Sequence, residues 1–161
     1  MALRAITNFR DIDKGLANIM STMKELNGVT IKVGILENSS KMRYKSGVSL
    51  VEVAVKNEFG IGVPERSFLR STFDNNEKQW NRRIARILRK RLFSYGHLRV
   101  AAIQIGRMIQ QSVQSTIVVM KSPPNSARTI ANKGANDPLI HTRRLLQNIK
   151  YNVDFGGKLG N

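Results

Sequence analysis

The chain has 161 residues, about the length of one domain, and a hydrophobic fraction of 41% is enough to form a core, which excludes global disorder. The absence of cysteine excludes disulfides, thiolate metal sites and thiol nucleophiles. The formal net charge is +16, and a field of this strength attracts nucleic acid, acidic protein or anionic lipid without distinguishing among them.

The first 35 residues predict one helix and one strand. Apolar residues recur at helical spacing from Phe9 to Leu26, which predicts an amphipathic helix over about residues 11–26. Asp11 and Asp13 near its start are acids of the kind favoured at a helix N-terminus rather than catalytic groups. Apolar side chains then alternate from Val29 to Ile35, as in a half-buried strand. The chain lacks the apolar run of a signal peptide or a membrane span, so we expect synthesis in the cytoplasm and no membrane partner.

A polar segment, a helix and a connector are predicted next. Residues 37–47 are polar and predict a loop or a hairpin tip. The following helix, Leu50–Glu58, has four apolar residues on one face: Leu50, Val51, Ala54 and Val55. Two glycines and a proline make Gly60–Pro64 a connector, because together they oppose any regular element. We expect the large apolar side chains around the connector to hold it to the core, namely Phe59, Phe68, Leu69 and Phe73.

Two longer helices follow the connector. Apolar residues from Trp80 to Leu92 mark a helix from Asp74 to about Tyr95. Gly96 interrupts the pattern, which restarts over about Leu98–Ile117. The interruption therefore predicts that one helix folds or kinks on the other.

The last 40 residues predict shorter elements. Pro123 and Pro124 enforce an extended loop, and Asn125 or Ser126 can cap a short helix that ends near Lys133. A second short helix over Thr142 to about Gln147 precedes a strand in which apolar residues alternate from Ile149 to Phe155, and residues 156–161 are expected to form a flexible tail. The whole chain therefore predicts a single α+β domain, with amphipathic helices packed on a small, mostly antiparallel sheet. The long polar loops, residues 37–47 and 121–137, are expected to order on assembly.

The helix predicted from Asp74 presents a basic face. From Lys78 onward, 16 lysines and arginines accompany only two acids, Asp137 and Asp154. At about 100° per residue, one stripe with its flanks holds Arg82, Arg83, Arg86, Arg89 and Lys90, opposite the apolar residues. Arg91 projects towards the apolar side, and Arg99 follows beyond Gly96. This face is either a solvated helix surface or a contact for phosphate or an acidic partner. We find no pattern for sequence-specific reading of DNA.

The sequence does not predict an enzyme. His97 and His141 stand apart from each other and from any acid at metal-ligand spacing. The Gly60-Ile61-Gly62 segment lacks the third glycine and the preceding strand of a dinucleotide-binding loop. The serines near Pro123 lack the flanking glycines of a nucleophile elbow. We therefore expect no catalytic residue, no metal and no cofactor.

Three stretches of the chain share a pattern with a known family. The first is Val33-Gly34-Ile35. The second is Asn57-Glu58-Phe59-Gly60 followed by Pro64, Arg66, Phe68, Leu69 and Arg70. The third includes Pro123, Pro124, Thr129, Lys133, Pro138, Leu139 and Thr142. In order and spacing these stretches resemble the tail-completion or neck proteins of tailed bacteriophages, and with the neighbouring strands the resemblance extends from Val29 to Val153.

The resemblance implies a structural protein of the virion at the head-to-tail junction. It implies a hexameric ring of copies of this chain, docked on neck, tail-tube or connector proteins around the passage for DNA. We expect the basic half to face either acidic protein or phosphate, such as that of packaged DNA bound non-specifically. Two positions depart from the family pattern. His141-Thr142-Arg143 replaces the usual Asp-Thr-Gly, and Ser67 stands where a second proline is common. The alternative is a small basic nucleic-acid-binding protein that acts outside any virion, and a hydrolase or nuclease would need a cluster of acids, histidines or metal ligands.

Overall fold

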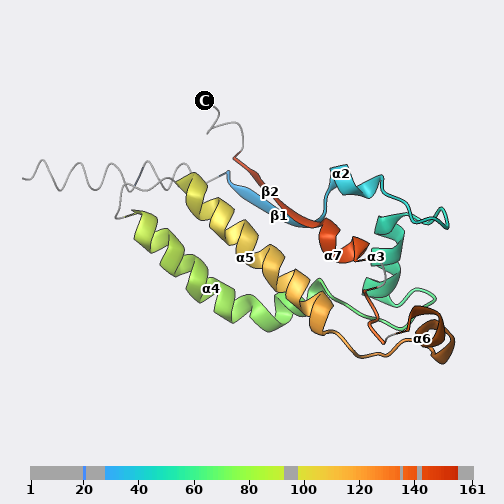
Figure 1. Cartoon of the computed structure of the whole chain (residues 1–161). Helices are drawn as coiled ribbons and strands as arrows, with labels where there is room; N and C mark the ends of the chain where they lie inside the picture. The colour runs from blue at the N-terminus through green and yellow to red at the C-terminus, as the bar shows by residue number, and fades with distance from the viewer. Residues whose placement is uncertain (1–19, 21–27, 93–97, 135, 141–142, 156–161) are drawn as a thin grey trace, which may run out of the picture.

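The computed structural model describes residues 20, 28–92, 98–134, 136–140 and 143–155, without the side chains of Arg91, Leu92 and Lys133. The fold is α+β, as the sequence predicts. In chain order its elements are β1 (Thr30–Ile35), α2 (Glu37–Ser40), α3 (Leu50–Phe59), α4 (Arg70–Leu92), α5 (Leu98–Val119), α6 (Ala127–Lys133), α7 (Arg144–Asn148) and β2 (Ile149–Asp154) (Figure 1). The helix predicted over residues 11–26 and the predicted tail of residues 156–161 lie outside the described residues.

The sheet consists of β1 and β2, which pair antiparallel although they lie near opposite ends of the chain. Val33 faces Tyr151 and Ile35 faces Ile149 in the register, so the alternating apolar residues of both strands share one face. That face packs on α5, whereas Lys32, Lys150 and Asn152 on the other face are exposed. Since only one face is covered, the alternation seen in the sequence follows directly.

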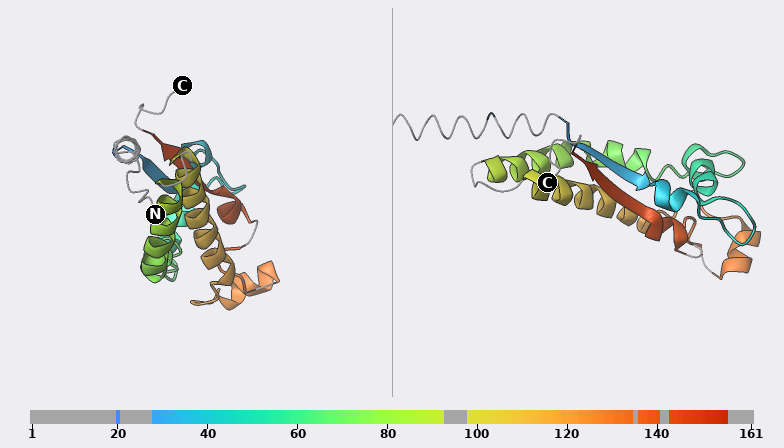
Figure 2. Two further views of the ribbon diagram at one scale, coloured as in Figure 1. Left: turned by 90° about the vertical axis from the view of Figure 1, so that its left-hand side faces the viewer. Right: turned by 90° about the horizontal axis from the view of Figure 1, so that it is seen from above.

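Helix α5 lies between the sheet and α4 (Figures 1 and 2). Its approach to the sheet depends on Gly106, where an added Cβ would lie 2.5 Å from Cδ2 of Tyr151. On its other side, α4 and α5 form the predicted helix pair. Trp80 of α4 is buried and donates from its ring nitrogen to Oγ of Ser112 at 3.3 Å.

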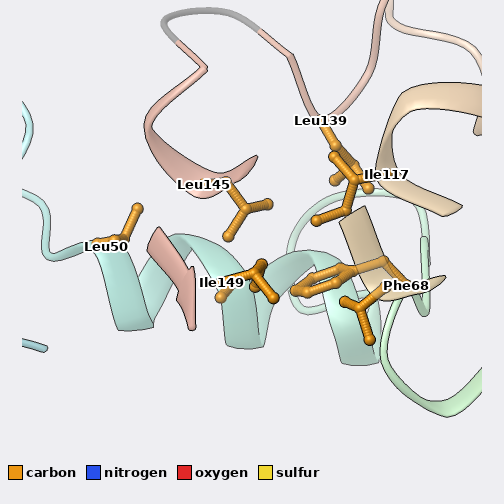
Figure 3. Packing of buried hydrophobic residues seen from close by; sticks show 8 residues of the cluster. Leu50, Phe68, Ile117, Leu139, Leu145 and Ile149 are labelled. Atoms are coloured by element: carbon orange, nitrogen blue, oxygen red, sulfur yellow. The ribbon is translucent and has the colours of Figure 1, made fainter. Parts of the chain in front are cut away.

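The main core lies where α3, α7 and the start of β2 meet the end of α5. Figure 3 shows side chains from these separate elements converging. The fully buried members include Phe68, which precedes α4, and Ile117 of α5. The complete buried cluster is Leu50, Ala54, Phe68, Val113, Ile117, Leu139, Leu145 and Ile149. Because five of these eight residues follow residue 112, the C-terminal third is integral to the fold.

The structure corrects the sequence-based boundaries and burial in three places. The segment of residues 37–47 starts with the helical turn α2, which the sequence does not predict, whereas the antiparallel bridge between Arg43 and Ser49 then closes the predicted hairpin tip. Helix α4 starts at Arg70, four residues before the predicted start. The sequence predicts Val55 on the apolar face of α3. In the structure Val55 is exposed, because the face that packs against the core is the one with Leu50 and Ala54.

The two long loops also make contacts within the chain. Arg144 donates to the carbonyl oxygen of Arg43 at 2.8 Å, and Lys121 pairs with Asp137. Ser126 caps α6 by accepting the amide hydrogen of Thr129, as the sequence predicts. The structure therefore gives these loops, which we expected to order on assembly, short helices and hydrogen bonds within the single chain.

Candidate interaction surfaces

Arg66 joins two of the stretches on which the family resemblance rests. Its side chain is only 6% exposed. Nε donates to the carbonyl oxygen of Pro123 and Nη2 to that of Pro124, both at 2.8 Å, and Nη1 reaches Oδ1 of Asn57 at 3.3 Å. All three acceptors are neutral, and burial lowers the pKa of the guanidinium from its ordinary value. Arg66 therefore fixes the Pro-Pro loop to the C-terminal end of α3.

Glu58 performs a second joining role from the same end of α3. The residue is only 4% exposed. Its carboxylate accepts the backbone amide hydrogens of Leu69 and Arg70, each at 2.9 Å. These amides lie at the start of α4, where the first N–H groups of a helix have no acceptor within the helix. The negative charge also favours the positive end of the helix dipole. Glu58 therefore caps α4 from a distance and explains why α4 begins before Asp74.

Arg70 completes this arrangement on its exposed side. Its Nε lies 3.3 Å from the buried Glu58 carboxylate, and its Nη2 contacts the carbonyl oxygen of Glu58 and, at 2.7 Å, the exposed carboxylate of Glu65. The guanidinium also lies over the ring of Phe59, 4.8 Å from its centroid. We define the motif cluster as Asn57, Glu58, Gly60, Arg66 and Arg70, together with the backbone of Pro123 and Pro124.

Gly60 is required in this cluster for two reasons. It ends α3 in the left-handed conformation, with φ of 69°, and its amide hydrogen bonds to the carbonyl oxygen of Lys56. A Cβ at this position would also lie 3.0 Å from Cβ of Glu65 and 3.2 Å from its backbone nitrogen. Both constraints exclude a larger residue without local rearrangement.

The large apolar residues around the connector divide into two groups. Phe68 is fully buried and Leu69 is half-buried, as expected. The prediction is wrong for Phe59 and Phe73, which are 56% and 46% exposed. Phe59 packs under Arg70 at the surface, and Phe73 meets the edge of Trp80 with ring centroids 5.0 Å apart. Periodicity alone did not reveal that the connector turns these two side chains away from the core.

The third stretch of the resemblance also adopts defined local structure. Leu139 is buried in the core and Pro138 is half-buried beside it, whereas Pro64 of the second stretch is exposed. Thr129 lies in the first turn of α6 and Lys133 at its end, while Thr142 and His141 lie outside the described residues. Arg143 has φ of 55°, and no other non-glycine among the described residues has a positive φ. This is the position at which the family usually has glycine, so the departure noted in the sequence occurs at a strained site.

The basic face of α4 forms the second candidate surface. Arg82, Arg83, Arg86 and Arg89 are all exposed, and within the described part of the chain none of them has a hydrogen bond or an ion pair. We call these four residues the arginine row. Lys90 is exposed next to it, and the backbone of Arg91 belongs to α4. Arg99 lies on α5 and stacks on Phe155 at 5.3 Å from the ring centroid, so we do not count it in the row.

Comparison of the chain with protein-family models, curated proteins and solved structures gave no match.

Exposed apolar side chains gather next to the motif cluster. They follow one another on the outer side of α3 and along the connector: Val55, Phe59, Ile61 and Val63. We call these four residues the connector patch. A contiguous group of exposed apolar side chains is a candidate contact surface for another macromolecule. A separate pair, Val118 and Val119, is exposed at the end of α5 beside a shallow groove of about 710 Å³ that α7 also lines.

Within the described ranges there is no set of three or more His, Cys, Asp or Glu side chains that could hold a metal ion. The groove between α4 and α5 is lined by uncharged side chains and Arg83, without a paired acid and base. In the same ranges, the helices are all too short or too polar to cross a bilayer.

Sequence reasoning identified the motif residues but not the roles of Glu58 and Arg66. A buried glutamate that caps a distant helix has no local signature, because its acceptor role depends on the return of the chain after the connector. The signal that could have revealed it is the lack of an acid in the first turn of α4, together with Leu69, which has no capping side chain, directly before Arg70.

Proposed function

We propose that this protein is a structural subunit of the head-to-tail junction of a tailed bacteriophage, a tail-completion, tail-terminator or neck protein. In this proposal, copies of the chain close into a hexameric ring that docks the tail on the head. The subunit acts by contact with other macromolecules and catalyses no reaction.

The observation that carries the proposal is the motif cluster. Residues from two of the three stretches that resemble this phage family form one hydrogen-bonded unit, in which Arg66 and Glu58 connect α3, the start of α4 and the Pro-Pro loop. A chance similarity of short segments would not require those segments to interact. Arg143 adds independent support, because its left-handed backbone is the conformation for which glycine, the usual family residue at this position, is suited.

The connector patch provides a surface for ring contacts. A ring requires each subunit to contact its neighbour through a fixed apolar or polar surface that is exposed in the single chain. The motif cluster holds the connector in place and so presents Phe59 and Ile61 in a defined position. Rigid presentation reduces the entropy cost of association.

Native mass spectrometry and electron microscopy of the purified protein, alone and mixed with phage tail tubes, test the proposal. We expect rings of six subunits, or rings on tube ends. The double variant Phe59→Ser and Ile61→Ser should remain folded by circular dichroism but lose the ring. Met42→Ser, which alters a large apolar residue that is exposed outside the connector patch, is the matched control and should keep it. A strictly monomeric protein that ignores tail tubes would contradict the proposal.

The arginine row favours a second candidate function, a small basic nucleic-acid-binding protein that acts outside any virion. Four exposed arginines on one helix face are a suitable surface for phosphate. The ring and tail-tube measurements discriminate between the two functions, because this candidate predicts a DNA-binding protein that forms no ring and does not bind tail tubes.

A further inference from the structure

We propose that the arginine row of α4 is a docking surface for the phosphate backbone of duplex DNA, bound without preference for base sequence. This inference rests on the proposed function, in which the ring surrounds the DNA that passes from head to tail. It specifies which surface of the subunit meets the DNA and by what chemistry.

The geometry of α4 brings six basic side chains into one continuous strip. At about 100° per residue, the arginine row, Lys78 and Lys90 fall within a sector of about 140°, whereas Trp80 and Ile84 lie outside it. With a rise of about 1.5 Å per residue, the strip from Lys78 to Lys90 is about 18 Å long. That length corresponds to about five base-pair steps of about 3.4 Å each, so several phosphates can be contacted at the same time.

Among the described residues, no ion pair involves an arginine of the row. No aspartate or glutamate occurs between Lys78 and Asn136. The four arginines also have no hydrogen-bonding partner among the described residues, in contrast to Arg66 and Arg70, which are engaged in the motif cluster. The guanidinium groups of the row are therefore available to release counterions from a phosphate backbone.

The composition of the strip favours DNA over an acidic protein. The centre of a protein interface is enriched in aromatic and apolar side chains and depleted in charge. The large exposed apolar residues of the described chain lie elsewhere, on the connector patch, at the end of α5, and at Met42, Phe73 and Met20, and none lies between Lys78 and Lys90. A strip of charge without an apolar centre is suited to a phosphate backbone, for which binding is almost entirely electrostatic.

Fluorescence anisotropy with two labelled 30-base-pair duplexes of unrelated sequence tests the inference. The first variant carries Arg82→Gln, Arg83→Gln, Arg86→Gln and Arg89→Gln. The control carries Lys32→Gln, Lys41→Gln, Lys45→Gln and Lys150→Gln, four exposed lysines outside α4. Both variants lose four positive charges, so they differ in the position of the lost charge and not in its amount. Circular dichroism establishes that both remain folded.

We expect the unmodified protein to bind both duplexes alike and to lose affinity by about a thousandfold between about 50 and 200 mM salt, as contact with about six phosphates requires. The arginine variant, with about two basic groups left in the strip, should lose only about tenfold over the same range and should bind at least about tenfold more weakly at 50 mM. The control variant should behave like the unmodified protein.

Three results would overturn the inference: equal weakening by both variants, a strong preference for one duplex, or binding to phosphatidylserine vesicles without binding to DNA. The ring assay separates this inference from the proposed function. Rings without any DNA binding would refute the docking surface and leave the ring proposal intact. DNA binding that depends on the arginine row, without rings, would support the docking surface and refute the proposed function.

Discussion

Replacement of Glu58 by glutamine tests whether the motif cluster stabilises the fold. The buried carboxylate accepts two backbone amide hydrogens at 2.9 Å and an arginine N–H at 3.3 Å. An amide group of nearly the same size has one oxygen and one NH₂, so at least one of the amides at the start of α4 loses its acceptor. An unsatisfied buried donor costs about 1–3 kcal/mol, and a hydrogen bond to a charged group contributes about 1.5–3 kcal/mol. We therefore expect Glu58→Gln to lower the free energy of unfolding by about 2–3 kcal/mol.

Glu65→Gln is the matched control for this prediction. Glu65 pairs with the same arginine, Arg70, at 2.7 Å, but its side chain is 56% exposed. An exposed pair contributes about 0–1 kcal/mol, so the same chemical change should have a small effect. Urea denaturation followed by circular dichroism measures the free energy of unfolding of both variants. In thermal denaturation, the Glu58 variant of a chain of this length should melt about 4–12 °C lower. Equal and small losses for the two variants would refute the assignment of Glu58 as the remote cap of α4.

Two further substitutions test local packing and backbone strain. Gly106→Ala should lower the free energy of unfolding by about 1–3 kcal/mol, because the new Cβ would lie 2.5 Å from the Tyr151 ring. In a protein that already carries Tyr151→Ala, the same change should instead stabilise helix α5 by up to about 1 kcal/mol. Thermal denaturation of the four proteins in this cycle measures the reversal, and its absence would mean that the ring does not limit the approach of α5. Arg143→Gly should raise the free energy of unfolding by about 0.5–1 kcal/mol, since it relieves a left-handed conformation. The control Arg128→Gly, in the exposed helix α6, should lower it by about 1 kcal/mol. A destabilised Arg143 variant would show that the arginine side chain compensates for the strain.

Much of the fold could be predicted from residue spacing alone. Period-2 alternation located β1 and β2, helical spacing located α3, α4 and α5, and the Pro-Pro loop with its candidate caps placed the short helix that follows Ser126. These predictions succeed because each of these elements packs against its neighbours on one side and exposes the other side to solvent. The resulting contrast between covered and exposed side chains repeats at the period of the backbone. The basic face of α4 was predictable for the same reason, since the angular position of each arginine follows from helix geometry.

The candidate site depended on information that local spacing does not contain. Phe59 and Phe68 are both large aromatic residues near the connector, yet one is exposed and the other fully buried. Likewise, Glu52 and Glu58 lie in the same helix, but Glu52 pairs at the surface with Lys56 whereas Glu58 is buried at the start of α4. The difference in each case comes from the path of the chain after Gly60, which returns residues 65–70 to the end of α3.

Residue spacing therefore predicts most of the secondary structure, the α+β class and the position of the positive charge, because these depend on residue types at short, regular intervals. The burial of polar groups and the partners to which they bond depend on the folded chain as a whole. Arg66 donates to the Pro-Pro loop, which lies more than 50 residues further along the chain, and β1 pairs with β2 near the opposite end of the chain. Such contacts depend on the packing of the whole core, in which buried charges and backbone amides find their hydrogen-bonding partners together. The spacing of residues along the sequence therefore does not predict them.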